Sequence, residues 1–418
     1  MIIRRPYEIL CKIYIIILIL IPILPLMRYI IPIPYFSSIK EILSVIAIMF
    51  SLMIIAKHNK FKIIRQDIII YFYIFYFIVH FFISNSFIGV IDSIRYQLLY
   101  LILIMTITMV SDILQKKFND VFQIFLKVIY ISGMFVAYIG LIESVNSTLI
   151  KNLYGSFTVH SDYMQNSGTR LISTMGNPIN LGIFMTLCII IGYYYNNNRV
   201  KNKLKIINIV NIIVFYYVVI LTYSRTSYIM IAIVTLLYFI RTMTRQNLKT
   251  KMKYILSVTI IIISLPFLLK DQIQLLSLRL TQFSATEIAR DGRFDYITRG
   301  INEVRSDVGT FIFGKGFGLL GWSENLFLIE NGYVAILYEL GLVGLILFLT
   351  ILFIYFLNVG KTLTSSRYSY EQKEIAFMLL AFLLVFCISM LTMASSTNLP
   401  YSAYIWLMYF GARNINRE

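Results

Sequence analysis

Long apolar runs constrain this chain more than any other feature of its sequence. A helix needs about 20 apolar residues to cross a bilayer, and runs near that length recur along the chain. The 418 residues are 59% hydrophobic and their mean hydropathy is +0.78, beyond the range of soluble globular domains. We therefore predict an all-α polytopic membrane protein, with residues 1–418 as a single integral membrane domain. About twelve predicted spans occupy residues 10–28, 39–56, 68–88, 94–110, 121–144, 178–195, 206–223, 226–240, 254–269, 331–357, 375–394 and 400–412.

The distribution of basic residues predicts the orientation of these spans. The formal net charge of +17 alone is compatible with nucleic-acid binding. The Lys and Arg residues instead recur in alternate short loops, and such loops stay cytoplasmic. Twelve spans with both termini cytoplasmic place all of these loops inside, and we expect no nucleic-acid partner. The basic loops include Arg4 and Arg5, Lys116 and Lys117, Arg199 to Lys205, Arg241 to Lys253, Lys361 to Lys373, and Arg413 with Arg417.

Two long loops, 145–177 and 270–329, then lie outside, and we expect them to form the active site. The second loop holds most of the charge on that side. Arginines and acids beside helix ends suit a charged or phosphorylated substrate outside the cell. The arginines of this loop are Arg279, Arg290, Arg293, Arg299 and Arg305.

An amphipathic helix is predicted within the second loop. Asp291 can cap its start, and the apolar residues that follow recur at helical spacing on one face. Arg293 and Arg305 flank that face and can reach inward over the protein, whereas Arg299 falls on the opposite face. Arg293 has a second interpretation, in which it snorkels beside the apolar face. The apolar face comprises Phe294, Ile297, Ile301 and Val304.

Arg225 lies in Thr222-Tyr-Ser-Arg-Thr-Ser227, a turn between two spans at their outer ends. A guanidinium at the membrane boundary needs a partner because its desolvation is costly. That partner is either a lipid headgroup or helix-end carbonyl, or the oxygens of a bound phosphate, which guanidinium matches in a bidentate fork.

Other motifs give weaker signals. Gly314-Lys-Gly-Phe-Gly318 is either a phosphate-cradling loop or a flexible turn, and it departs from the Walker pattern because no Ser or Thr follows Lys315. His80 is either a proton relay or a residue bonded to a neighbouring helix. Cys11, Cys188 and Cys387 are scattered through apolar runs, so we expect neither a disulfide framework nor a metal site, and no cofactor.

The chain resembles the Wzy-type O-antigen and capsular polysaccharide polymerases and the related O-antigen ligases. Together the matching motifs cover roughly Arg170 to Gly344, while the first five spans match only in topology. The motifs are Gly176-Asn-Pro-Ile-Asn-Leu-Gly182, Thr222-Tyr-Ser-Arg225, Gly292-Arg293, Gly314-Lys-Gly316, Glu330-Asn-Gly-Tyr333 and Glu339-Leu-Gly-Leu-Val-Gly344.

The resemblance implies a GT-C-like fold in the bacterial cytoplasmic membrane and glycosyl transfer at its outer face. A polymerase of this kind moves a growing chain from undecaprenyl diphosphate onto a new lipid-linked repeat unit, building O-antigen, capsule or exopolysaccharide. Its expected partners are the lipid-linked glycan, membrane lipids, a chain-length regulator and a flippase. Arg225 and Arg293 would hold the diphosphate. The expected substrate contacts are Arg170, Asn177, Arg290, Arg305, Asn331 and Tyr333.

Glu330 stands where the related ligases usually carry His before Asn. A carboxylate can accept the proton of an attacking sugar hydroxyl, so this departure favours a polymerase with Glu330 as the base. The alternative is an ion pair between Glu330 and a loop arginine. Two other functions remain as alternatives: an O-antigen ligase, and a lipid-linked oligosaccharide flippase. A flippase would be expected to distribute charge along its spans, whereas here the charge collects in the loops.

Overall fold

The protein is described by a computed structural model that covers residues 4–31, 36–58, 67–84, 87–147, 149, 152, 170–197, 202–245, 292–317, 329, 331–393 and 401–415. Within these ranges the chain forms helices and turns and contains no strand. The predicted all-α fold is confirmed.

The helices follow the apolar runs closely. Those of the N-terminal half are α1 (Arg4–Ile30), α2 (Ile39–His58), α3 (Ile68–Ile83), α4 (Phe87–Ser93), the π-helical turn η3 (Ile94–Leu98), α5 (Leu99–Ile113), α6 (Phe118–Val145) and α9 (Pro178–Asn197). Those of the C-terminal half are α10 (Asn202–Leu221), α11 (Arg225–Arg245), α15 (Gly292–Arg305), α16 (Val308–Phe313), α17 (Gly332–Thr364), α18 (Tyr370–Thr392) and α19 (Tyr401–Ile415). Short 3-10 turns occur at Phe36–Ser38 (η1) and Ser173–Met175 (η4).

Eight helical segments of the described chain are long and apolar enough to cross a membrane. Two shorter apolar helices, Ile68–Ile83 and Lys205–Leu221, accompany them. The chain is therefore a polytopic membrane protein. The total of about twelve spans stays a prediction, because the run 254–269 lies outside the described residues. The eight segments are Pro6–Met27, Ile39–His58, Phe87–Ile113, Phe118–Val145, Pro178–Asn197, Arg225–Thr244, Gly332–Thr364 and Tyr370–Thr392.

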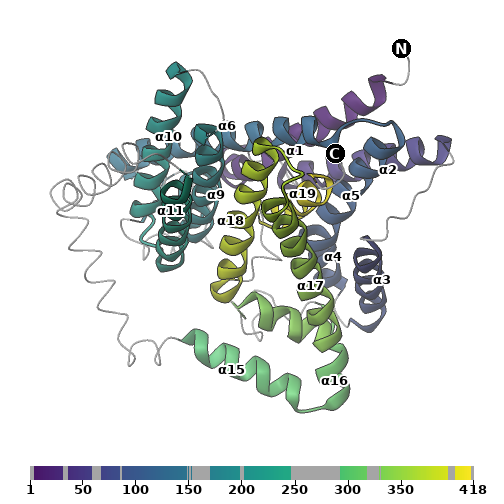
Figure 1. Cartoon of the computed structure of the whole chain (residues 1–418). Coiled ribbons are helices and arrows are strands. Elements are labelled where there is room, and N and C mark those ends of the chain that lie inside the picture. Colours follow the sequence, from purple (N-terminus) through teal and green to yellow (C-terminus); the bar gives the residue numbers. More distant parts are fainter. Residues whose placement is uncertain are drawn as a thin grey trace.

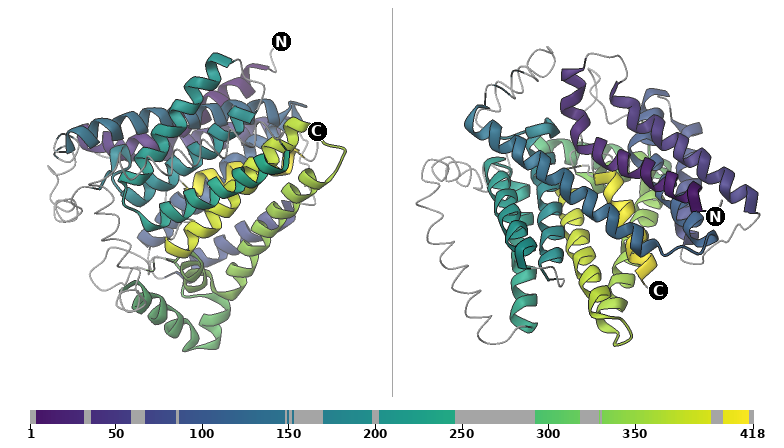
Figure 2. Two further views of the ribbon diagram at one scale, coloured as in Figure 1. Left: turned by 60° about the vertical axis from the view of Figure 1, so that its left-hand side comes forward. Right: turned by 90° about the horizontal axis from the view of Figure 1, so that it is seen from above.

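The helices pack as two groups that cross. Helices α1, α2 and α6 run at a steep angle to α9, α10, α11, α17 and α18 (Figures 1 and 2). Helix α18 is central to the second group, since it packs against α9, α11, α17 and α19. One continuous apolar core joins both groups, so the spans form a single body around α18.

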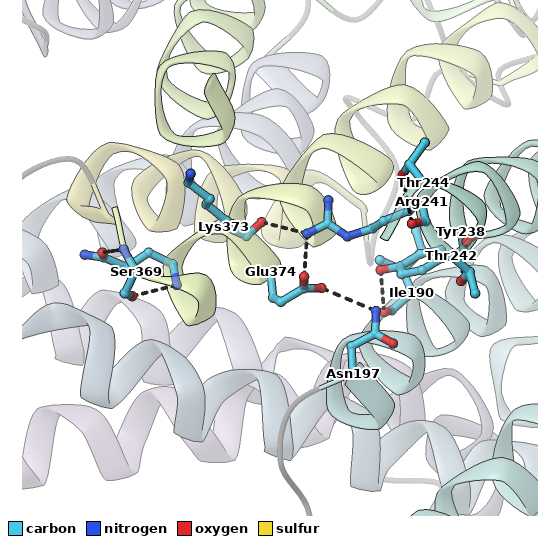
Figure 3. Close-up of polar contacts among 10 residues, drawn as sticks. Ile190, Asn197, Tyr238, Arg241, Thr242, Thr244, Ser369, Lys373 and Glu374 are labelled. Carbon is cyan, nitrogen blue, oxygen red and sulfur yellow. Dashed lines mark hydrogen bonds and ion pairs between the residues drawn. The ribbon is translucent and has the colours of Figure 1, made fainter. Parts of the chain in front are cut away.

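One end of the bundle, which we call the basic end, is joined by buried ion pairs. Arg241 at the end of α11 donates to Glu374 at the start of α18 over 2.6 Å, and Asn197 at the end of α9 bonds the same carboxylate (Figure 3). Arg413 at the end of α19 pairs with Asp67 before α3 over 2.7 Å. These contacts join only helix ends that the predicted topology places on one side.

The opposite end, the loop end, joins the complementary set of helix ends. Thr226 at the start of α11 bonds Thr392 at the end of α18, 2.9 Å between hydroxyl oxygens. Asn331 before α17 donates to the Leu391 carbonyl over 3.0 Å. Helices α15 and α16 lie at the bottom of Figure 1, beyond the start of α17. The alternation of the two ends agrees with the predicted topology, while its orientation in the membrane remains a prediction.

Candidate functional site

Three of the spans that begin at the loop end lack an acidic residue in the first turn. They are α9, α11 and α17, and all three pack against α18. A helix N-terminus carries partial positive charge that Asp or Glu in the first turn often offsets. Because that offset is missing in all three helices, this end of the bundle favours an anion supplied from outside.

Two of the predicted substrate contacts cap these helices. Asn177 Oδ1 accepts hydrogen bonds from the amides of Ile179 (2.8 Å) and Asn180 (3.3 Å) at the start of α9. Asn331 Oδ1 accepts from Tyr333 (3.0 Å) and Val334 (3.1 Å) at the start of α17. Since Asn331 also donates to Leu391, its side chain orients the helix start. The expected contact of Asn331 with the substrate stays a prediction.

Arg225 is the first residue of α11 and is half-buried. The preceding Tyr223 has a φ of 47°, a left-handed conformation that is uncommon for a bulky residue. That turn lets α11 follow α10 directly and places Arg225 at the boundary, as the sequence predicts. A cation at a helix N-terminus is electrostatically unfavourable by itself, so the position favours a nearby anion.

A strap formed by Arg170–Gly176 joins the starts of α9 and α11. Arg170 Nε donates to the Thr222 carbonyl over 3.0 Å, and the Leu171 amide donates to the Leu221 carbonyl over 3.0 Å. Arg170 thus lies beside the turn that carries Arg225.

Glu143, which the sequence analysis did not single out, anchors this strap. Its fully buried carboxylate at the end of α6 accepts from the amides of Ile172 (3.2 Å) and Ser173 (2.7 Å). The available signal was a lone acid at the end of an otherwise apolar run.

Helix α15 confirms part of the predicted amphipathic helix. Val304 is buried against Tyr338 and Ala335 of α17, and Arg299 is exposed and paired with Glu303 over 3.3 Å. Arg305 is exposed as well, and its predicted contact with the substrate stays a prediction. It stands at the last position of the helix, where the chain turns away toward α16.

The Gly-rich loop after α16 docks on a kink in α17 and does not cradle phosphate. The amides of Lys315 and Gly316 donate to the carbonyls of Tyr338 (2.9 Å) and Glu339 (3.0 Å). Gly314 donates to Thr310, and Phe317 donates to Ser84 Oγ over 2.7 Å. All four amides are therefore occupied by protein acceptors. The turn interpretation is correct, although the loop is firmly bonded.

His80 bonds the end of α16 beside this kink, with its Nε2 2.5 Å from the Phe313 carbonyl. Gly341 has a φ of 67° and opens the α17 backbone there, which frees the Leu340 carbonyl to accept from Tyr76 over 2.8 Å. The interpretation of His80 as a residue bonded to a neighbouring helix is confirmed.

Lys315 joins the Gly-rich loop to α15 and α17 through Glu303. Its Nζ lies 2.9 Å from Glu303 Oε2, which also accepts from the Tyr338 hydroxyl over 2.9 Å. Burial alone would raise the pKa of the Glu303 carboxyl, but the hydrogen bonds from Lys315 and Tyr338 outweigh it and hold that pKa below its ordinary value. We call Glu303, Lys315 and Tyr338 the clasp; no motif in the sequence indicated it.

Several predicted site residues are not placed by the structure. Glu330 and Arg290 lie outside the described residues, and of Arg293 only the backbone in α15 is described. Tyr333 donates its hydroxyl to the Cys387 carbonyl over 3.0 Å, so it ties α17 to α18, and its expected role as a substrate contact stays a prediction. Among the described residues, no cluster of His, Cys, Asp or Glu is suited to a metal ion.

The fold and this end of the bundle define a multi-pass membrane protein with a cationic, helix-start site at one face. Residues 209–349 match the family model described as O-Antigen ligase. This segment is thus similar to the O-antigen polymerase and ligase superfamily, and the similarity supports a role in polysaccharide assembly. The matched segment contains Arg225, Arg293, the Gly-rich loop and Glu330. No curated protein matches the chain.

Proposed function

We propose that the chain is a polysaccharide polymerase that uses lipid diphosphate-linked glycans at the outer face of the cytoplasmic membrane. The observation that carries this proposal is Arg225 at the first position of α11, among three helix starts without an acid. Such a site suits a diphosphate, because guanidinium and helix amides both bind phosphate oxygens.

The proposed reaction is a direct displacement at the anomeric carbon of the donor. The acceptor hydroxyl oxygen forms the new bond to that carbon, and the bond to the diphosphate oxygen breaks. Arg225 and Arg293 stabilise the negative charge of the departing undecaprenyl diphosphate. Glu330 takes the proton of the attacking hydroxyl. No nucleotide sugar is consumed, since the donor carries its own leaving group.

A ligase is the second candidate, favoured by the description of the matched family. The two activities differ in the acceptor alone. Purified protein is given lipid diphosphate-linked repeat units, with or without a different lipid acceptor. A ladder of products from repeat units alone supports the polymerase. Transfer that occurs only when the other lipid is present would identify a ligase.

Loss of the gene separates both enzymes from a flippase. Cells without a polymerase should carry single repeat units at the surface, and cells without a ligase should carry undecorated acceptor lipid. Cells without a flippase should carry no units outside.

A further inference from the structure

A second polar cluster lies on helices that the proposed reaction does not use. Glu41 Oε1, in the first turn of α2, accepts from Lys40 Nζ over 2.9 Å and from Arg95 Nε over 2.6 Å. The three side chains are 8%, 12% and 25% exposed for Lys40, Glu41 and Arg95. Two cations thus share one carboxylate, and the further acid Asp92 is exposed to solvent one turn before Arg95.

This cluster lies at the loop end. Ser84, which ends α3, bonds the Phe317 amide of the Gly-rich loop, and α4 with Arg95 follows shortly after Ser84. In Figure 1, α17 and α18 lie between α11 and α4. The Lys40–Arg95 cluster and Arg225 are therefore on one side of the bundle but on separate helices.

Several polar atoms of the cluster lack partners. Among the described residues, Glu41 Oε2, both polar atoms of Gln97 and the Tyr100 hydroxyl are buried without a hydrogen bond. Gln97 and Tyr100 are 3% and 1% exposed. Of the Arg95 nitrogens, only Nε bonds a described residue. Buried polar groups are nearly always satisfied, so these unpartnered atoms, acceptors as well as donors, point to a bound polar ligand and its water.

The backbone here is also distorted, and its surroundings face lipid. Arg95 and Gln97 lie in the π-helical turn Ile94–Leu98, a form that occurs frequently at functional sites. The neighbouring faces of α2 and α4 expose apolar side chains, as expected beside lipid tails. These are Ile42, Val45, Ile46 and Met49 on α2, and Phe87, Ile88 and Ile91 on α4.

We propose that Lys40 and Arg95 hold the diphosphate of a second lipid-linked substrate, the acceptor. This inference rests on the proposed polymerase function, which joins two lipid-linked chains. The acceptor reacts at the end of its repeat unit that is remote from its lipid, so its diphosphate must bind apart from Arg225. The free edge of the Arg95 guanidinium matches phosphate oxygens, and the apolar faces of α2 and α4 receive the lipid tail.

The test counts undecaprenyl diphosphate molecules bound to the purified full chain by native mass spectrometry. We expect two on the unmodified protein and one on the double variant Lys40→Gln with Arg95→Gln. The matched control is Lys361→Gln with Arg367→Gln, which removes two exposed cations at the basic end and should still bind two. Arg95→Lys keeps the positive charge but loses the planar guanidinium. It is the conservative variant to use if the double variant does not fold.

Kinetics give a second readout in the polymer assay. The double variant should raise the KM for the acceptor about tenfold, the usual scale for a lost charge-assisted hydrogen bond, and leave the KM for the donor unchanged. Arg95→Lys should give an intermediate acceptor KM.

Three results would overturn the inference: two lipids on the double variant, an unchanged acceptor KM, or displacement of the second lipid by phosphatidylglycerol as readily as by undecaprenyl diphosphate. The last would identify an ordinary phospholipid site, and inorganic diphosphate added alone shows whether the tail is needed. The two proposals can also fail separately. If the unmodified protein makes no polymer but the double variant still binds one lipid fewer, the proposed function is contradicted and the lipid site is supported.

Discussion

Arg225 is the residue on which the proposed diphosphate site depends most. Lys at this position keeps the charge but loses the planar fork that binds two phosphate oxygens at once. We expect Arg225→Lys to lower turnover in the polymer assay by about tenfold to a hundredfold, with protein level near normal. Arg299→Lys is the control, since Arg299 is exposed and pairs within its own helix. Full polymer length from Arg225→Lys would show that Arg225 is a structural residue.

Glu330 is the proposed base, and its substitution tests the chemistry itself. Glu330→Gln preserves size and hydrogen bonding but cannot accept the proton. Turnover should fall about a hundredfold or more, the usual contribution of general base catalysis, while substrate KM changes little. Glu330→His should restore part of the activity because imidazole can take the same proton. Equal turnover of the Gln and Glu proteins at every pH would assign the reaction to the arginines alone.

At the scale of elements, the face of α15 decides which of its arginines matter. The helix is docked through Val304 and carries Arg299 on its exposed side. We expect Arg293→Ala to abolish most polymer formation, whereas Arg299→Ala should cost less than about 1 kcal/mol of stability, the value of an exposed ion pair, and little activity. Product ladders from the two purified variants measure this. Equal losses would mean that α15 presents a different face to the substrate.

The clasp holds α15 against α17, and a charge swap tests it. Glu303→Lys and Lys315→Glu each break the pair and should shorten the polymer by loosening α15. The double swap should recover part of the activity, because the ion pair re-forms with its signs exchanged. Activity lost equally in the single and double variants would show that the clasp has no positioning role.

The clasp also carries a pH dependence with a definite sign. The folded state lowers the pKa of Glu303 relative to its ordinary value of 4.5. Its contribution to stability is therefore present above about pH 4.5 and is lost as pH falls through the lower folded value. Thermal unfolding of Glu303→Gln should match that of the unmodified protein more closely at low pH than at pH 7.

For the whole molecule, the open question is the direction in which the bundle crosses the membrane. Gly300, on the predicted outer loop, is buried in α15, so a label placed there would report poorly. Ser306 and Ser366 are exposed, next to α15 and between α17 and α18. A Cys at 306 should react with an impermeant reagent added outside intact cells, and a Cys at 366 should not. The reverse pattern would place the entire site in the cytoplasm.

Much of the site could be anticipated from single residues, and some of it could not. Arg225 was placed correctly because a short turn between two apolar runs leaves an arginine no other position. Helical projection assigns Arg305 a face, but it cannot tell that α15 ends at this residue. The hydrogen bonds of Asn331 and Tyr333 to Leu391 and Cys387 could not be anticipated, because those carbonyls belong to a different helix.

The sequence by itself determined the apolar spans, their alternating ends and the motifs that gather at one of them, because hydropathy, charge asymmetry and turn residues act locally along the chain. Only the tertiary structure decided which polar groups meet. Glu143 and Ser173 are 30 positions apart, and Glu41 and Arg95 are 54 apart. A buried carboxylate accepts hydrogen bonds from the donors that helix packing brings next to it. Which donors these are depends on the crossing angles of the helices and on how deep each residue lies in the bundle, and no local sequence pattern records either.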